Sequence, residues 1–169
     1  VIIGLIIYSA IQAYYAIAGN FESKSSYHPH TKPVILGILI CIFIEIIIGT
    51  EIRGGLDMSR KENPLIEGVI LLKMLGPFKY MHTILGFTLL GLTIYLWKIV
   101  NDIKFISSSF MVNSVNFIMG LIITQIILGE ALVFLEVKPL MQLFHMWFSS
   151  LLVGLSVASF TFYKISMEK

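Results

Sequence analysis

Residues 34–50 read VILGILICIFIEIIIGT, an apolar run whose only charged side chain is Glu45. Inside a bilayer no water is available to bind backbone N–H and C=O groups, so such a run can cross only as a helix or within a closed barrel. A helix needs about 20 predominantly apolar residues to span the hydrocarbon core. This run is close to that length and predicts a membrane-spanning helix.

Three later segments predict three more spans: Phe78 to Trp97, Val112 to Phe134 and Leu140 to Tyr163. Across the chain, 57% of residues are hydrophobic and 13% are charged, whereas a soluble domain carries about a quarter charged residues. The sequence therefore predicts an all-α, polytopic membrane protein built around a four-helix transmembrane bundle.

A further apolar segment, residues 1–18, predicts one additional N-terminal helix. The chain starts within this segment without a methionine, and no basic region or small-residue cleavage site marks it as a signal peptide. We interpret the chain as a fragment that starts partway through a helix, or as a processed product. The expected organisation is this helix, a loop at residues 19–33, and a four-helix domain at residues 34–169 with a long outer loop at residues 52–76.

Charge and cysteine content narrow the function classes. The net charge of +2 is too small to indicate nucleic-acid binding, and the aromatic residues fall in the spans rather than among basic clusters. The single cysteine, Cys41, lies within a span, so no intrachain disulfide can form. Abundant isoleucine and lysine beside few arginines are typical of an AT-rich bacterial genome, so we expect a multi-pass protein of the bacterial plasma membrane.

An internal repeat links the spans. Residues 45–51, EIIIGTE, match residues 125–130, QIILGE, and each copy lies near the end of a predicted span. A loop and then a histidine-bearing helix follow each copy, so the two histidine helices, separated by one span, run in the same direction across the membrane. The alternative is coincidence, because short isoleucine-rich strings recur easily in such a chain.

The two histidines are His82, five residues after Pro77, and His145, six residues after Pro139. At about 1.5 Å of rise per residue, their depths differ by roughly one residue if both helices start at the same face. Two imidazoles from facing helices of a four-helix bundle can ligate one haem iron, which then has no open position and transfers electrons. A single histidine in an apolar span would instead be explained by ordinary helix packing.

Small and cationic residues near the histidines fit a haem. Gly86 and Ser149 lie four residues after His82 and His145 and would admit a flat ring, although close helix packing in membranes favours the same residue types. The haem propionates need cations, for which the candidates are Arg53, Lys79 and Lys138. Arg53 is the best of them because guanidinium binds carboxylates bidentately, although interfacial cations also simply snorkel to water.

Three further features have two interpretations each. Glu45, mid-span, must be paired, protonated or in a polar cavity, so it is either a proton-network residue or an acid hydrogen-bonded between helices. His28-Pro29-His30 resembles a ligand motif, but we expect a solvated loop because no carboxylate or cysteine stands nearby at metal-site spacing. Residues 65–76 predict a short interfacial helix or a hydrophobic loop over the bundle.

Four motifs together carry a family resemblance: residues 44–55 (IEIIIGTEIRGG), 80–86 (YMHTILG), 125–129 (QIILG) and 143–145 (LFH). They resemble the C-terminal half of heme A synthase. The resemblance implies eight helices in two four-helix halves related by a pseudo-twofold axis, and oxidation of a heme O methyl group to the heme A formyl group for cytochrome oxidase. It also implies that residues 1–18 are the last helix of the N-terminal half, and that a haem b is held between His82 and His145.

The chain departs from the family pattern in three places. The family's catalytic half has a glutamate three residues before a histidine that is followed by arginine, whereas Lys79 and Thr83 hold these positions here. This segment therefore does not resemble the catalytic half, and catalytic residues stay unassigned. Glu45 stands where the family usually has glutamine, and the loop at residues 52–76 lacks the cysteine pair of some members.

The sequence thus predicts the C-terminal portion of a heme A synthase, which binds one haem b for electron transfer or structure. The full-length protein would be an oxidoreductase, and this portion alone would not catalyse the oxidation. Expected partners are membrane lipid, heme O as substrate, heme O synthase and oxidase assembly factors, with a homo-oligomer left open. The rival functions are another membrane cytochrome b and a haem-free transporter or scaffold subunit.

Overall fold

The described part of the chain forms four long helices. A computed structural model of the 169 residues describes residues 8, 10–11, 26–66, 70, 73–102, 104–105, 107–135 and 138–167. The helices in this part are α2 (Thr31–Glu62), α4 (Phe78–Val100), α5 (Ser109–Phe134) and α6 (Pro139–Met167), all long and apolar enough to cross a membrane. The predicted all-α membrane fold is confirmed. The helix predicted at residues 1–18 falls almost wholly outside the described residues.

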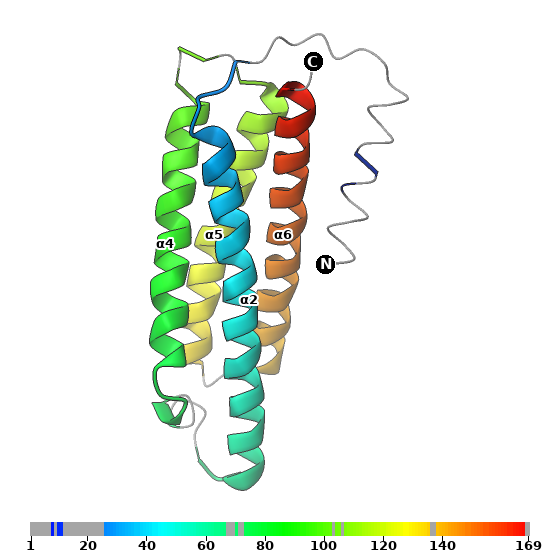
Figure 1. The fold of residues 1–169 in the computed structure, drawn as a ribbon. Helices are drawn as coiled ribbons and strands as arrows, with labels where there is room; N and C mark the ends of the chain where they lie inside the picture. The colour runs from blue at the N-terminus through cyan, green and yellow to red at the C-terminus, as the bar shows by residue number, and fades with distance from the viewer. Residues whose placement is uncertain are drawn as a thin grey trace.

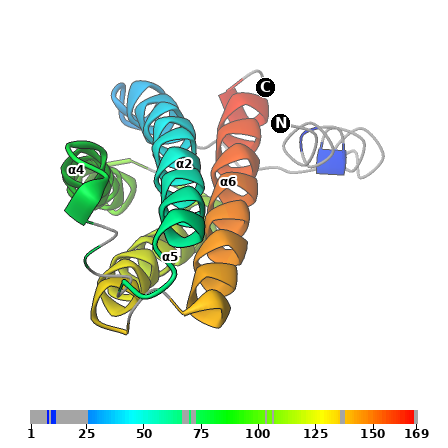
Figure 2. The same cartoon turned by 90° about the horizontal axis from the view of Figure 1, so that it is seen from below.

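The helices form a bundle in which each element runs antiparallel to the next (Figure 1). Helix α2 packs on α4 and α6, and α5 packs on the same two helices. Seen along the bundle, α4 and α6 therefore occupy opposite corners (Figure 2). Since both run in the same direction, equivalent residues near their starts reach the bundle axis at the same depth.

Helix α2 is longer than the sequence analysis predicts. The predicted span ends at Thr50 and a loop is expected from residue 52, but the helix continues to Glu62 and projects beyond its neighbours (Figure 1). Leu56 explains this extension, since it is only 4% exposed and packs in a small apolar cluster with the partly buried residues Ile52, Leu75, Leu132 and Val133. The outer loop consequently begins after Glu62.

The end of the outer loop turns sharply into α4. Gly76 has a φ of 64°, a left-handed conformation that glycine adopts without steric cost, and Pro77 stands at the helix start as N-cap. Residues 67–69 and 71–72 lie outside the described residues, so the interfacial helix at residues 65–76 stays a prediction.

Helix α5 begins at a side-chain cap. The Ser108 hydroxyl accepts a hydrogen bond from the backbone N–H of Met111 at 3.2 Å, which satisfies one of the free N–H groups of the first turn. The same hydroxyl lies 3.3 Å from the Tyr27 hydroxyl, and the Tyr27 ring packs on Tyr163. These contacts join the segment before α2 to the start of α5 and the end of α6.

The apolar core is concentrated in the half of the bundle that holds the start of α2 and the end of α6. Helix α6 contributes Leu152, which is 4% exposed, and the fully buried Thr161. The fully buried apolar side chains there come from α2, α4 and α5 and include Ile35, Ile38, Ile42, Leu96, Met111, Val115, Ile118 and Ile122. In the other half, which carries the histidines, Ile48 and Leu56 are the only buried hydrophobic side chains among the described residues. The histidine half is thus packed less tightly.

Truncation of the core should destabilise the bundle. Ile118 is 1% exposed. Ile118→Ala should lower the free energy of unfolding by an amount near the low end of about 2–5 kcal/mol. In lipid the hydrophobic transfer free energy contributes little, because the surroundings are apolar too, but the cavity left by the lost side chain still removes packing contacts. The adjacent Phe117 is 69% exposed, so Phe117→Ala is the matched control with little effect. Thermal unfolding midpoints in detergent test this, and equal shifts for both variants would contradict the assigned core.

Candidate functional site

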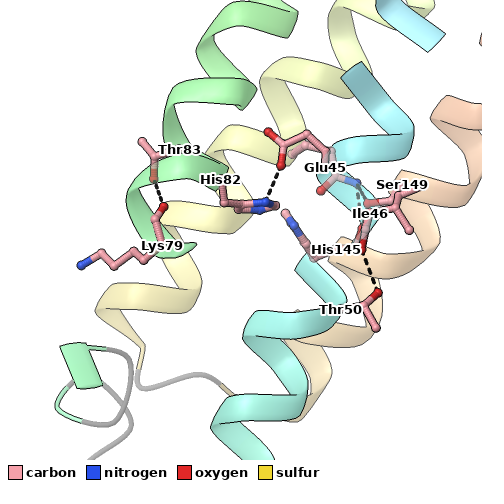
Figure 3. Close-up of polar contacts among 9 residues, drawn as sticks. Glu45, Ile46, Thr50, Lys79, His82, Thr83, His145 and Ser149 are labelled. Atoms are coloured by element: carbon pink, nitrogen blue, oxygen red, sulfur yellow. Dashed lines mark hydrogen bonds and ion pairs between the residues drawn. The ribbon is translucent and has the colours of Figure 1, made fainter. Parts of the chain in front are cut away.

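The two predicted ligands meet in the less tightly packed half of the bundle. His82 lies near the start of α4 and His145 near the start of α6. Their ring centroids are 6.3 Å apart with the planes inclined at 60°, and the imidazoles point toward one another across the bundle (Figure 3). The diagonal placement of parallel α4 and α6 is what brings residues so distant in sequence together.

The separation of the rings matches one shared metal ion. A metal–imidazole bond is about 2 Å long, and a five-membered ring with bonds of about 1.33 Å has a radius of about 1.1 Å. Two such ligands on opposite sides of one ion would place the ring centroids about 6.2 Å apart, close to the 6.3 Å observed. Within the described ranges, no group of three or more His, Cys, Asp or Glu side chains could hold a metal.

A glycine backs each imidazole. A Cβ at Gly49 would lie 3.4 Å from Cε1 of His82, and a Cβ at Gly129 would lie 3.8 Å from Cε1 of His145. The glycines belong to α2 and α5, the neighbours of the two histidine helices. Because these glycines lack a side chain, each imidazole lies directly against a backbone. Gly49 and Gly129 also hold the same place in the two copies of the repeat.

The polar residue of each copy approaches the following histidine helix, but in different ways. Oε2 of Glu45 contacts the ring nitrogen Nδ1 of His82 (Figure 3). Nε2 of Gln125 instead donates to the backbone oxygen of His145 at 2.7 Å and to Oγ of Ser149 at 2.9 Å. Nδ1 of His145 is buried and has no hydrogen-bond partner among the described residues.

The small residues at the site make room for these polar side chains. A Cβ at Gly86 would lie 3.3 Å from Oε1 of Glu45. Ser149 receives the Gln125 amide and also donates to the backbone oxygen of His145 at 2.9 Å. Gly86 and Ser149 therefore have equivalent positions in the two halves of the site, each one turn beyond its histidine.

The candidate cations lie around the histidine end. Arg53 contacts the sulfur of Met146, the residue after His145, and its Nε is 3.9 Å from the carboxylate of Asp57. Lys79 is partly exposed, with its Nζ 5.7 Å from the centre of the Tyr80 ring, and it points away from the imidazoles (Figure 3). Lys138 is exposed just before α6. Of these three cations, Arg53 is the one that contacts the residue next to His145 in the sequence.

The sequence analysis missed the glycine backing and the Gln125 bonds. Both could have been found from the repeat, because aligning its copies pairs Glu45 with Gln125 and Gly49 with Gly129. The other histidine motif lies elsewhere: His30 is the N-cap of α2, and its Nδ1 is 2.7 Å from the Tyr95 hydroxyl. It belongs to the tightly packed end and joins no metal-binding group in the described part of the chain.

Loss of the Gln125 amide should loosen the packing of α5 on α6. Interhelical hydrogen bonds in membranes are worth about 0.6 kcal/mol on average and up to about 1.7, so Gln125→Leu should cost about 1–2 kcal/mol of stability for two bonds. Thr124→Val is the matched control, since its hydroxyl bonds within α5 to the oxygen of Gly120 at 2.8 Å. Thermal unfolding midpoints in detergent measure this effect, and equal midpoints for the two variants would refute the role of Gln125.

Comparison with known proteins gives one family. A family model for the cytochrome oxidase assembly proteins, COX15-CtaA, matches residues 1–157, which is most of the chain. Neither a curated protein nor a solved structure gives a match. The resemblance to heme A synthase drawn from the four motifs is thereby confirmed at the level of the family, and it supports a role in cytochrome oxidase assembly. The chain belongs to the COX15-CtaA family of cytochrome oxidase assembly proteins, the heme A synthases.

Proposed function

We propose that this chain is the C-terminal portion of a heme A synthase and binds one haem b between His82 and His145. The meeting of the two imidazole rings, 6.3 Å apart, is the observation that carries the proposal. The protein supplies two ligands at this point and, in its described part, no third. Such a pair suits a macrocycle that brings the other four iron ligands itself.

The surroundings of the pair support a large, flat ligand. The inward-facing residues of this half, among them Gly49, Gly129 and the two histidines, stay partly exposed, whereas the opposite half is filled by buried isoleucine, leucine and valine. The buried Nδ1 of His145 lacks a partner among the described residues. A bound cofactor would bury these surfaces and take up the coordinating capacity of both rings.

The chemistry of the bound group would be electron transfer. A haem iron with two axial imidazoles has no open coordination position, so it supplies or accepts electrons and does not bind oxygen. The chain's own residues would hold the haem, with His82 and His145 as ligands of the iron and Gly49 and Gly129 behind their rings. Arg53, at the same end, would face a propionate, with Lys79 as the second candidate.

Oxidation of the heme O methyl group to the formyl group would then belong to the full-length protein, with this half in electron transfer or structural support. Lys79 and Thr83 stand where the catalytic pattern requires glutamate and arginine. The contact of Glu45 with His82 also accounts for a mid-span carboxylate without a transport pathway. It favours a haem protein over a transporter or scaffold subunit.

Removal of either histidine should abolish haem binding. The protein purified in detergent should show a b-type reduced-minus-oxidised visible spectrum, and His82→Ala and His145→Ala should each lose it because one axial ligand is gone. His28→Ala, in the segment before α2, is the matched control and should keep the spectrum. A wild-type protein without the spectrum, or alanine variants that both retain it unchanged, would refute the proposal.

A further inference from the structure

The two halves of the site correspond position by position, and one pair reaches different parts of the two histidines. His82 corresponds to His145, Gly49 to Gly129, and Gly86 to Ser149, since the members of each pair make matching contacts. The remaining pair is Glu45 and Gln125, which hold the same place in the repeat. Here the correspondence breaks, because a carboxylate reaches the ring of His82 while an amide reaches only the backbone of His145.

Glu45 is held for this contact by its surroundings. Its side chain is 13% exposed and that of His82 is 31% exposed, so the pair is largely shielded from water. The other carboxylate oxygen, Oε1, lies over Gly86, 3.3 Å from the position that a Cβ would take there. The carboxylate thus lies between the imidazole of His82 and the backbone of Gly86.

A carboxylate at Nδ1 has a defined effect on a metal-ligating histidine. The proton on Nδ1 is shared with the carboxylate, so the other nitrogen, Nε2, is left free for the metal. Such a partner orients the ring and makes the imidazole a stronger electron donor. Negative charge beside the iron also favours the more positive, oxidised state, which lowers the reduction potential.

We propose that Glu45 is a positioning residue that orients His82 through Nδ1 and makes it the more electron-donating of two unequal axial ligands, which lowers the potential of the haem. This inference rests on the haem b proposed for His82 and His145. The unequal pair arises from the difference between Glu45 and Gln125 in the two copies of the repeat. Glu45 itself does not touch the iron.

The test is a potentiometric titration of the purified haem protein. Glu45→Gln installs the residue that the other copy carries, so the fold tolerates its shape. Measured at the wild-type midpoint, the ratio of reduced to oxidised haem should rise about tenfold, equivalent to about 59 mV for a one-electron couple. Glu51→Gln removes an exposed carboxylate from the same helix and should leave the midpoint unchanged.

A second variant and a second measurement complete the test. Glu45→Asp keeps the charge but withdraws it by one methylene, so its midpoint should also rise, by less. Haem affinity should fall about 10- to 100-fold in Glu45→Ala, as for other partners of metal-bound histidines. Midpoints equal to wild type in Glu45→Gln and Glu45→Asp would overturn the inference while the haem site stands. Absence of haem from the wild-type protein would instead overturn the proposed function.

Discussion

The close approach of an imidazole to a helix backbone is the constraint on which the site depends. Two large rings can meet at the axis of a four-helix bundle only if the neighbouring helices offer no large side chain at that level. Gly49 and Gly129 meet this condition, with virtual Cβ positions 3.4 and 3.8 Å from the two rings. A Cβ at either place would only be in van der Waals contact with the ring, but a side chain longer than that of alanine would compete with the ring for space.

The division of the bundle into two unlike halves follows from this constraint. At one end, residues such as Ile38, Leu96 and Ile118 interdigitate and leave at most 1% of each side chain exposed. At the other end, glycine, serine and histidine replace them, so dispersion contacts between helices are fewer. The dense half supplies the rigidity with which α4 and α6 hold their first turns in place, and the sparse half is where a ligand can add packing.

Much of this fold could be predicted from the sequence, because hydrocarbon leaves a buried chain few options. The apolar runs fixed the existence of the spans, and the odd number of crossings between His82 and His145 fixed their common direction. The extension of α2 could not be predicted, since Gly54-Gly55 favours a turn and only the tertiary contacts of Leu56 favour a helix. The Glu45–His82 contact was missed because a span pattern gives the depth of a residue but not its partner.

Comparison of the two copies of the repeat distinguishes the residues that helix packing requires from those that the chemistry of the site requires. Glycine and histidine are the same in both halves of the site because each half must solve the same steric problem. The residue one turn before each glycine, Glu45 or Gln125, is not under this steric constraint. It points past the ring toward Gly86 or Ser149, where either an amide or a carboxylate fits. A charge at this position carries a desolvation cost within the membrane that an amide avoids. Glu45 is therefore not explained by packing, and its contact with His82 is the interaction in the described structure that offsets its cost.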